Sequence, residues 1–170
     1  MRHFLPILIT LLFLISCKND MKVTYGSYEE YPVYEGNLGL IYSPEKSRFR
    51  IRAPTADAIK IRLYDQDLGG EPTAVQDLKR DNQGTWQATF NEDLEGKYYT
   101  FEATIDRKNL GETPDPYVRA VGTNGKRGQV IDFVKTNPEG WLAHQKPALK
   151  NVNDIIIYEL HIRDLSLIHI

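Results

Sequence analysis

The chain has 170 residues, of which 41% are hydrophobic, 26% charged and 11% aromatic, and its formal net charge is −2. This composition is that of a globular protein of about one domain, and it argues against a wholly disordered, collagenous or coiled-coil chain. The single cysteine excludes an internal disulfide framework and a cysteine-rich zinc site. The near-neutral charge provides no basic footprint for nucleic acid, so nucleic acid is not among the expected partners.

Residues 1–16 differ in composition from the rest of the chain. A short positive head precedes residues 4–15, which are nearly all apolar. That run is shorter than the roughly 20 residues of a transmembrane helix, and it predicts a secretory signal peptide. The order Leu-Ile-Ser before Cys17 resembles the lipobox of bacterial lipoproteins, which implies that Cys17 becomes the lipid-modified first residue of the mature chain. An ordinary signal peptide or a buried apolar helix is the alternative.

The lipid expected on Cys17 implies a membrane as one partner. A diacylglycerol together with an N-acyl chain supplies more than one acyl anchor, as stable anchoring requires. Residues 17–35 are polar and largely without a period, and they predict a tether between the lipid and the folded part. The expected location is therefore the bacterial cell envelope, as an exported lipoprotein.

Residues 36–135 carry the alternation of half-buried strands. Apolar side chains occupy every second position in four segments, at 49–51, 59–63, 86–90 and 99–105, and a weaker strand is predicted at 75–80. Residues typical of turns separate these segments. Short, regularly spaced strands with such turns predict an all-β fold, an immunoglobulin-like antiparallel β-sandwich.

The last part of the chain has a different pattern. Residues 136–152 are polar, contain two prolines and predict a linker. Residues 154–163 then open with three consecutive isoleucines, which is typical of a strand buried on both faces of a parallel sheet. Residues 153–170 therefore predict the start of an α/β domain. A lone parallel strand needs neighbours for its backbone groups and both faces, so we expect a chain that is cut short there.

Five pieces of the sequence occur in the order found in carbohydrate-binding module family 48 and the enzymes that carry it. They are residues 49–64, Gly84-Thr85-Trp86, residues 96–101, residues 113–117 with 130–132, and residues 156–164. Over about residues 36–166 the chain resembles such a module followed by the first barrel strand of type I pullulanases, which belong to the α-amylase clan, glycoside hydrolase family 13.

The resemblance implies an enzyme that hydrolyses α-1,6-glucosidic bonds in pullulan, starch or glycogen. It implies a β-sandwich followed by a (β/α)8 barrel, with the three carboxylates of the clan at the ends of barrel strands four, five and seven. Retention of configuration needs two carboxyl groups about 5–5.5 Å apart. Because the sequence ends near strand one, no catalytic residue is assigned, and the chain by itself is expected to be an inactive N-terminal fragment.

Three aromatic residues are candidates for stacking on the glucose rings of an α-glucan partner. Trp86 lies in phase with the predicted core residues of its strand, which favours a core position instead. Trp141 lies in the linker, where packing against the barrel is the alternative. Tyr98 is out of phase with the core of its strand and is expected at the surface.

Asp115, Pro116 and Tyr117 predict a rigid turn that docks the sandwich onto the next domain, because proline fixes the backbone angle. A ligand site is the alternative for these three residues. The glycines and basic residues of 122–128 lack the spacing of a phosphate loop and predict a hairpin-like loop. The histidines lack metal-ligand spacing, and no metal or cofactor is expected.

Two other functions stay open at this point. One is a non-catalytic α-glucan-binding surface lipoprotein, and the other is a structural or adhesive sandwich of the envelope. The run at 154–163 argues for the enzyme fragment, because a binding module has no use for a strand buried on both faces. Within the enzyme reading, isoamylases and branching enzymes are the alternatives to pullulanases.

Overall fold

The structure is a computed structural model that describes residues 24–161, and the predicted signal peptide, Cys17 and residues 162–170 lie outside the described residues. The chain divides into two compact units between Asp132 and Phe133. The first unit contains every strand of the described chain, and the second contains only 3₁₀ turns and irregular backbone.

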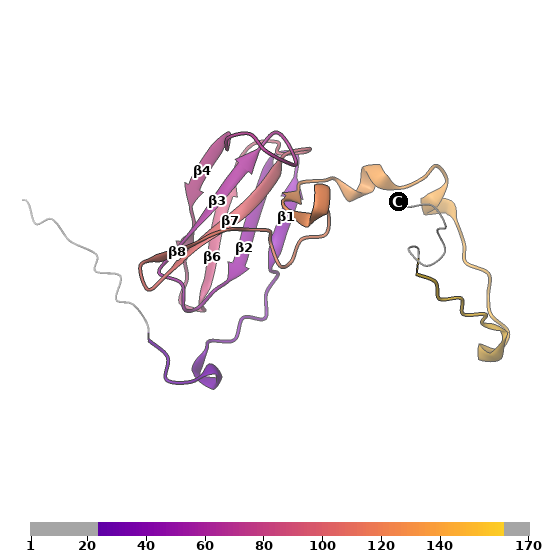
Figure 1. Cartoon of the computed structure of the whole chain (residues 1–170). Coiled ribbons are helices and arrows are strands. Elements are labelled where there is room, and N and C mark those ends of the chain that lie inside the picture. The colour runs from indigo at the N-terminus through magenta and orange to yellow at the C-terminus, as the bar shows by residue number, and fades with distance from the viewer. Residues whose placement is uncertain (1–23, 162–170) are drawn as a thin grey trace, which may run out of the picture. The chain divides into compact units, whose positions relative to one another are not determined.

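Two antiparallel sheets make up the first unit (Figure 1). In sheet A the order is β1 (Gly39–Ser43), β2 (Lys46–Arg52), β6 (Thr85–Phe90) and β5 (Lys79–Arg80). In sheet B it is β4 (Ala74–Asp77), β3 (Ala58–Tyr64), β7 (Tyr98–Ile105) and β8 (Lys108–Thr113), with β9 (Gly128–Gln129) also pairing with β7. The predicted all-β antiparallel sandwich is confirmed.

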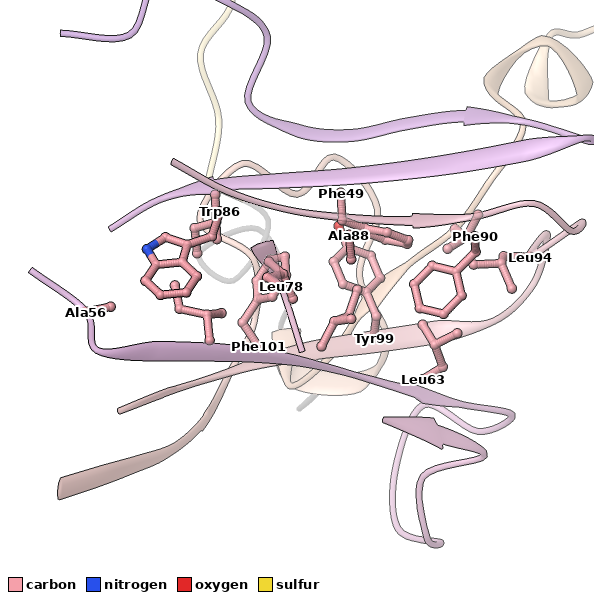
Figure 2. Close-up of a cluster of buried hydrophobic side chains, with 14 residues drawn as sticks. Phe49, Ala56, Leu63, Leu78, Trp86, Ala88, Phe90, Leu94, Tyr99 and Phe101 are labelled. Carbon is pink, nitrogen blue, oxygen red and sulfur yellow. The ribbon is translucent and has the colours of Figure 1, made fainter. Parts of the chain in front are cut away.

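The alternating residues of the four predicted strands meet between the two sheets. The inward side chains of β2 and β6 lie over those of β3 and β7 in one buried cluster (Figure 2). The Phe49 ring makes edge-to-face contacts with Phe90 and Tyr99, at 5.8 and 4.8 Å between ring centroids. Such contacts add to the free energy gained by burying the rings, so the core is built on the residues that alternate in the sequence.

The weak strand predicted at 75–80 is two strands in two different sheets. Here β4 pairs with β3 in sheet B, whereas β5 pairs with β6 in sheet A. Leu78 lies at the crossing, where its side chain is buried and its backbone N–H donates to the Ile59 carbonyl at 2.8 Å. This one residue therefore anchors the connection between the sheets.

Three strands lie outside both the four clear alternating segments and the weaker one at 75–80. The first, β1, pairs with β2, while β8 forms a hairpin with β7 and β9 covers the start of β7. At the hairpin tip Asp106 and Arg107 have φ of 50° and 63°. Two positive φ values in a two-residue loop are the geometry that matches the twist of a tight hairpin.

Residues 32–34 of the predicted tether contact sheet A. The Arg52 guanidinium donates to the Pro32 carbonyl at 3.1 Å, and the Arg50 guanidinium lies 4.9 Å from the centroid of the Tyr34 ring. Gly84 adopts φ +71° beside Pro32, where a Cβ would come within 3.1 Å of the proline ring. We call residues 32–34 the strap, and the stretch before it carries the 3₁₀ helix η1 (Tyr28–Glu30).

The strand predicted at 154–163 does not form within the described residues. Residues 155–161 have no strand pairing, and η5 (Val152–Asp154) precedes them. Two further 3₁₀ helices, η3 (Phe133–Thr136) and η4 (Trp141–Ala143), complete this unit, and η2 (Thr123–Gly125) belongs to the sandwich. The physical reason is that this unit offers the three isoleucines neither a neighbouring strand nor a covering layer.

No helix among residues 24–161 is both long and apolar enough to cross a membrane.

Candidate functional site

Tyr98 is the first residue of β7 and is half-buried on the outer side of sheet B. It lies opposite Tyr64 of β3 and Gln129 of β9 in the strand register. A Cβ added at Gly122 would come within 3.1 Å of its Cε1 atom. The loop that holds Gly122 therefore passes close to one edge of the Tyr98 ring.

Two loops gather beside Tyr98, one after β3 and one before β9. The Asp67 carboxylate accepts from the Thr123 backbone N–H at 3.2 Å and from the Thr123 hydroxyl. These bonds, the hydroxyl first, lower the pKa of Asp67. The Arg127 guanidinium donates to the Gln66 carbonyl at 2.6 Å. The two loops are thus tied together, and they give the neighbourhood of Tyr98 a fixed shape.

A polar layer lies between these loops and the rest of sheet B. The Arg127 guanidinium is 3.4 Å from the centroid of the Tyr64 ring, which it covers. The Tyr64 hydroxyl and the Thr100 hydroxyl both donate to Glu112 Oε2, at 2.5 and 2.7 Å. Burial, followed by the bond to Glu112, raises the pKa of Tyr64. Tyr64 is therefore a supporting group below the surface, whereas Tyr98 is the ring that stays open to a ligand.

Glu102 and Glu112 lie opposite each other on β7 and β8. Arg62 donates to Glu102 Oε2 at 2.6 and 2.9 Å, and Asn109 donates to Glu102 Oε1. Burial raises the pKa of Glu112, but the bonds from Tyr64 and Thr100 and the nearby arginines outweigh it, so the net pKa is lowered. A general acid needs a raised pKa, so this pair has the properties of a structural ion-pair cluster.

The arrangement around Tyr98 suits a carbohydrate. A half-exposed tyrosine ring can stack on the apolar face of a sugar, and charged or amide side chains at its border can bind the hydroxyl groups. Lys97, next to Tyr98 in the sequence, forms an ion pair with Asp65. Gln129 lies opposite Tyr98 on the neighbouring strand β9. The site can bind and orient a sugar, but it offers no group arranged for bond cleavage.

Trp86 lies in the core with only 6% of its surface exposed. Its indole Nε1–H donates to the Ala53 carbonyl at 2.8 Å, and the Arg80 guanidinium is 5.7 Å from the ring. No face of the ring is open to a sugar in this position. The structure thus favours the core interpretation of Trp86 over the carbohydrate-binding one.

Trp141 belongs to the second unit and is 57% exposed. It lies on η4 at a shallow hollow that is lined by Pro138, Glu139, Gly140, Ala143 and His144. The three aromatic residues predicted to bind carbohydrate therefore do not form one site. Trp86 is in the core, Tyr98 is on the outer side of sheet B, and Trp141 is in the other unit.

Asp115 is 2% exposed and its partners lie within the sandwich. The Tyr99 hydroxyl donates to Asp115 Oδ2 at 3.0 Å, and the Tyr117 backbone N–H donates to Oδ1 at 2.8 Å. Burial raises the pKa of Asp115 more than these two bonds lower it. The Asp115 carboxylate closes a turn against β7, and Pro116 and Tyr117 are exposed. The docking of this turn onto the next domain stays a prediction.

Within residues 24–161 no group of three or more possible ligands could hold a metal ion. The predicted loop at 122–128 is confirmed, since Val121 and Gly128 form a bridge that closes it. The residues that shape the candidate site, Asp67, Thr123 and Arg127, were not predicted. Asp67 and Thr123 are 56 positions apart, and no spacing rule links side chains across such a distance.

Comparisons with known proteins are consistent with a carbohydrate-binding role. The family model of carbohydrate-binding module 48 (isoamylase N-terminal domain) matches residues 37–118. The chain is 33% identical to the chloroplastic pullulanase 1 of Arabidopsis thaliana over 83% of its own length and 15% of that protein. It is 30% identical to a Bacillus subtilis pullulanase over 84% of its length and 19% of that protein.

Solved structures give the same result. The chain is similar to a mutant pullulanase from Paenibacillus barengoltzii in complex with maltotriose, with a TM-score of 0.75 and 43% sequence identity. That similarity covers 85% of this chain and 23% of the solved chain. The sequence therefore spans a small part of each protein that it resembles.

Proposed function

Through residues 37–118 the chain belongs to the carbohydrate-binding module 48 family, and it matches the N-terminal region of type I pullulanases. We propose that it is the accessory glucan-binding part of a debranching enzyme. The enzyme hydrolyses α-1,6-glucosidic bonds in pullulan, starch or glycogen. The observation that carries this proposal is the 43% identity to a pullulanase solved with maltotriose.

The binding role is assigned to the outer side of sheet B at Tyr98. Its support is the half-buried ring, the two loops joined by Asp67 and Thr123, and the charged groups at the border of the ring. The carboxylates nearby on this sheet, Glu102 and Glu112, hold the sheet together through Arg62. From the family resemblance, the three catalytic carboxylates of the enzyme are assigned to its barrel, and we expect no hydrolytic activity from residues 24–161 by themselves.

Residues 155–161 are assigned to the first strand of that barrel. The support is their apolar, β-branched sequence and their exposure in the described chain. A strand of this kind becomes ordered when neighbouring strands supply its hydrogen bonds and helices cover it. Trp141, in the preceding segment, packs against the same barrel.

Export and a lipid on Cys17 complete the proposal. The support comes from the sequence, where a positive head, an apolar run and the single cysteine follow one another. The protein is then held in the bacterial cell envelope by acyl chains. Metabolic labelling with a radioactive fatty acid tests this step, with incorporation expected in the wild type and lost in Cys17→Ser.

Glucan binding is tested by electrophoresis of the mature chain, starting at residue 17, through gels that contain pullulan or glycogen. We expect retardation by both polymers. Tyr98→Ala weakens it about three- to tenfold, because the ring loses its stacking contact. Tyr117→Ala is the matched control, since this exposed tyrosine lies outside the site, and it leaves the retardation unchanged.

Equal thermal unfolding of the two variants and the wild type ensures that the comparison reports on binding. Migration unaffected by either polymer contradicts the proposal and favours a structural sandwich of the envelope. Release of reducing ends from pullulan by the chain itself contradicts its accessory role.

A further inference from the structure

Five basic side chains lie on the outer side of sheet A. The inward residues of β2 are buried, so Lys46, Arg48, Arg50 and Arg52 share the outer side of the strand. Lys79 of β5 lies opposite Gln87, and Gln87 lies opposite Arg50, which places Lys79 on the same side of the sheet. We call these five residues the basic face.

One carboxylate, Asp81, balances the centre of the basic face. It forms an ion pair with Arg50 at 3.0 Å. The intervening strand β6 contributes only uncharged side chains to this side, namely Thr85, Gln87 and Thr89. Within residues 24–161 neither Arg48 nor Lys79 has an ion-pair partner. The basic face therefore carries an uncompensated positive charge.

The outer side of sheet B has the opposite balance. Its basic residues Lys60 and Arg62 are matched by Asp77, Glu102 and Glu112, at distances of 3.9, 2.6 and 3.8 Å. The protein as a whole has a net charge of −2. An excess of positive charge on one side of an acidic protein can orient it toward an anionic surface.

The chain that leads to Cys17 departs from the basic face. The strap lies on this side of sheet A, with its Pro32 carbonyl bonded to Arg52 and its Tyr34 ring against Arg50. Cys17 precedes Pro32 by 15 positions. A connection of this length reaches at most about 50 Å when it is fully extended. A lipid at Cys17 would thus hold the sandwich within about 50 Å of the membrane, tethered from the side of sheet A that carries the strap.

We propose that the basic face lies against the membrane and binds the phosphate groups of anionic lipid headgroups. This orientation rests on the lipid anchor of the proposed function, whereas the affinity for phosphate does not. Polybasic surfaces are attracted to anionic leaflets over about a Debye length. Such a surface supplies a second, reversible contact beside the acyl chains. It also leaves Tyr98, on the other sheet, facing away from the membrane.

Acidic residues border the basic face and limit its extent. Glu35 follows the strap, and Glu45 and Glu92 lie in the turns at the end of the face where Ser47 pairs with Phe90. Arg48 lies one position from Ser47, next to this border, whereas Lys79 lies opposite Gln87, farther along the face.

The test uses the mature chain with Cys17→Ser, which carries no lipid, and sedimentation with vesicles. We expect binding to vesicles of phosphatidylcholine with phosphatidylglycerol and none to pure phosphatidylcholine. Binding falls as salt rises, because the interaction is screened. The double variant Arg48→Gln/Lys79→Gln weakens it by about fivefold for each charge removed.

The matched control is Lys60→Gln/Lys108→Gln, which removes the same charge from sheet B, at half-buried Lys60 and exposed Lys108. It leaves vesicle binding nearly unchanged. Equal weakening by both double variants would overturn the proposal, since only the net charge of the protein would then matter. Equal binding to neutral and anionic vesicles, or no binding to either kind of vesicle, would overturn it too. Retardation by pullulan and fatty-acid labelling of wild-type Cys17 are measured separately, so a failure of the proposed function is distinguished from a failure here.

Discussion

Two segments that contain isoleucine, β3 and residues 155–157, differ in structure. In β3, Ile61 is fully buried, with β4 on one side of its strand and β7 on the other. In the second unit Ile156 is 94% exposed and pairs with no strand. Both are β-branched residues with a strong preference for strands. A segment with this preference therefore forms a strand only where neighbouring strands supply hydrogen bonds and a packed layer covers its side chains.

The largest expected difference between the two regions comes from the core. Phe49→Ala removes a ring that packs against Phe90 and Tyr99. We expect the free energy of unfolding of the sandwich to fall by about 3–5 kcal/mol, the usual cost of such a cavity. Ile156→Ala, the matched change in the other region, alters it by less than about 0.5 kcal/mol. Urea unfolding followed by tryptophan fluorescence measures both, and a comparable loss in the second variant would break the comparison.

A smaller difference is expected from two aspartates that both accept backbone hydrogen bonds. Asp81 accepts from the Gln83 and Thr85 N–H groups and from Arg50. Asp154 accepts from the Asn151 N–H at the start of η5. We expect Asp81→Ala to lower the free energy of unfolding by about 1–3 kcal/mol, because the buried Thr85 and the part-buried Arg50 lose an acceptor. Asp154→Ala leaves it unchanged.

The same aspartate gives a dependence on pH. Burial raises the pKa of Asp81, but the bonds from Thr85 and Gln83 and the charge of Arg50 outweigh it, so the net pKa is lowered. Its stabilising contribution is therefore present above the unfolded value of about 3.9 and is lost as pH falls through the folded value. Unfolding titrations should show this loss in the wild type and a flatter profile in Asp81→Ala.

The smallest expected effect comes from Asp115, in the turn that follows β8. Burial raises the pKa of Asp115, so its contribution is full below the unfolded pKa and is lost as pH rises through the folded value. An asparagine does not ionise; its carbonyl oxygen can accept from the Tyr117 N–H in place of Oδ1, and its amide group can donate to the Tyr99 hydroxyl in place of Oδ2. We expect Asp115→Asn to remove this part of the pH dependence and to shift the free energy of unfolding at neutral pH by about 1 kcal/mol or less. A steeper decline with rising pH in the variant would contradict the assignment.

Much of the fold could be predicted, because buried strands alternate. Phe49, Ile61 and Phe101 each mark a strand whose inward face is fixed by period two. In β1 this signal fails, since Leu40 and Tyr42 point inward while Ile41, an apolar residue, points outward. In β8 it is absent, because all six residues are exposed and the strand depends on its hairpin partner.

The candidate site was predicted only through Tyr98, whose outward phase follows from its strand. The two loops around Tyr98 could not be predicted, because the hydrogen bonds between Asp67 and Thr123 form only when the folded sandwich brings these distant segments together. The strand predicted at 154–163 is the opposite case, in which the sequence signal is present but the strand does not form within the described residues. The apolar run is a property of the sequence, whereas a neighbour to pair with is a property of the whole fold.

Val130 has a practical consequence for anyone who expresses the domain. Its side chain is 0% exposed, and its backbone bonds to Gly96 and Lys97 at 2.9 Å on both sides. It lies beyond the matched family region of residues 37–118, as the strap does at the other end. A recombinant piece cut at those limits would lose a core side chain and the cover of Arg50. Residues 31–132 keep both, and they are the limits at which we would clone it.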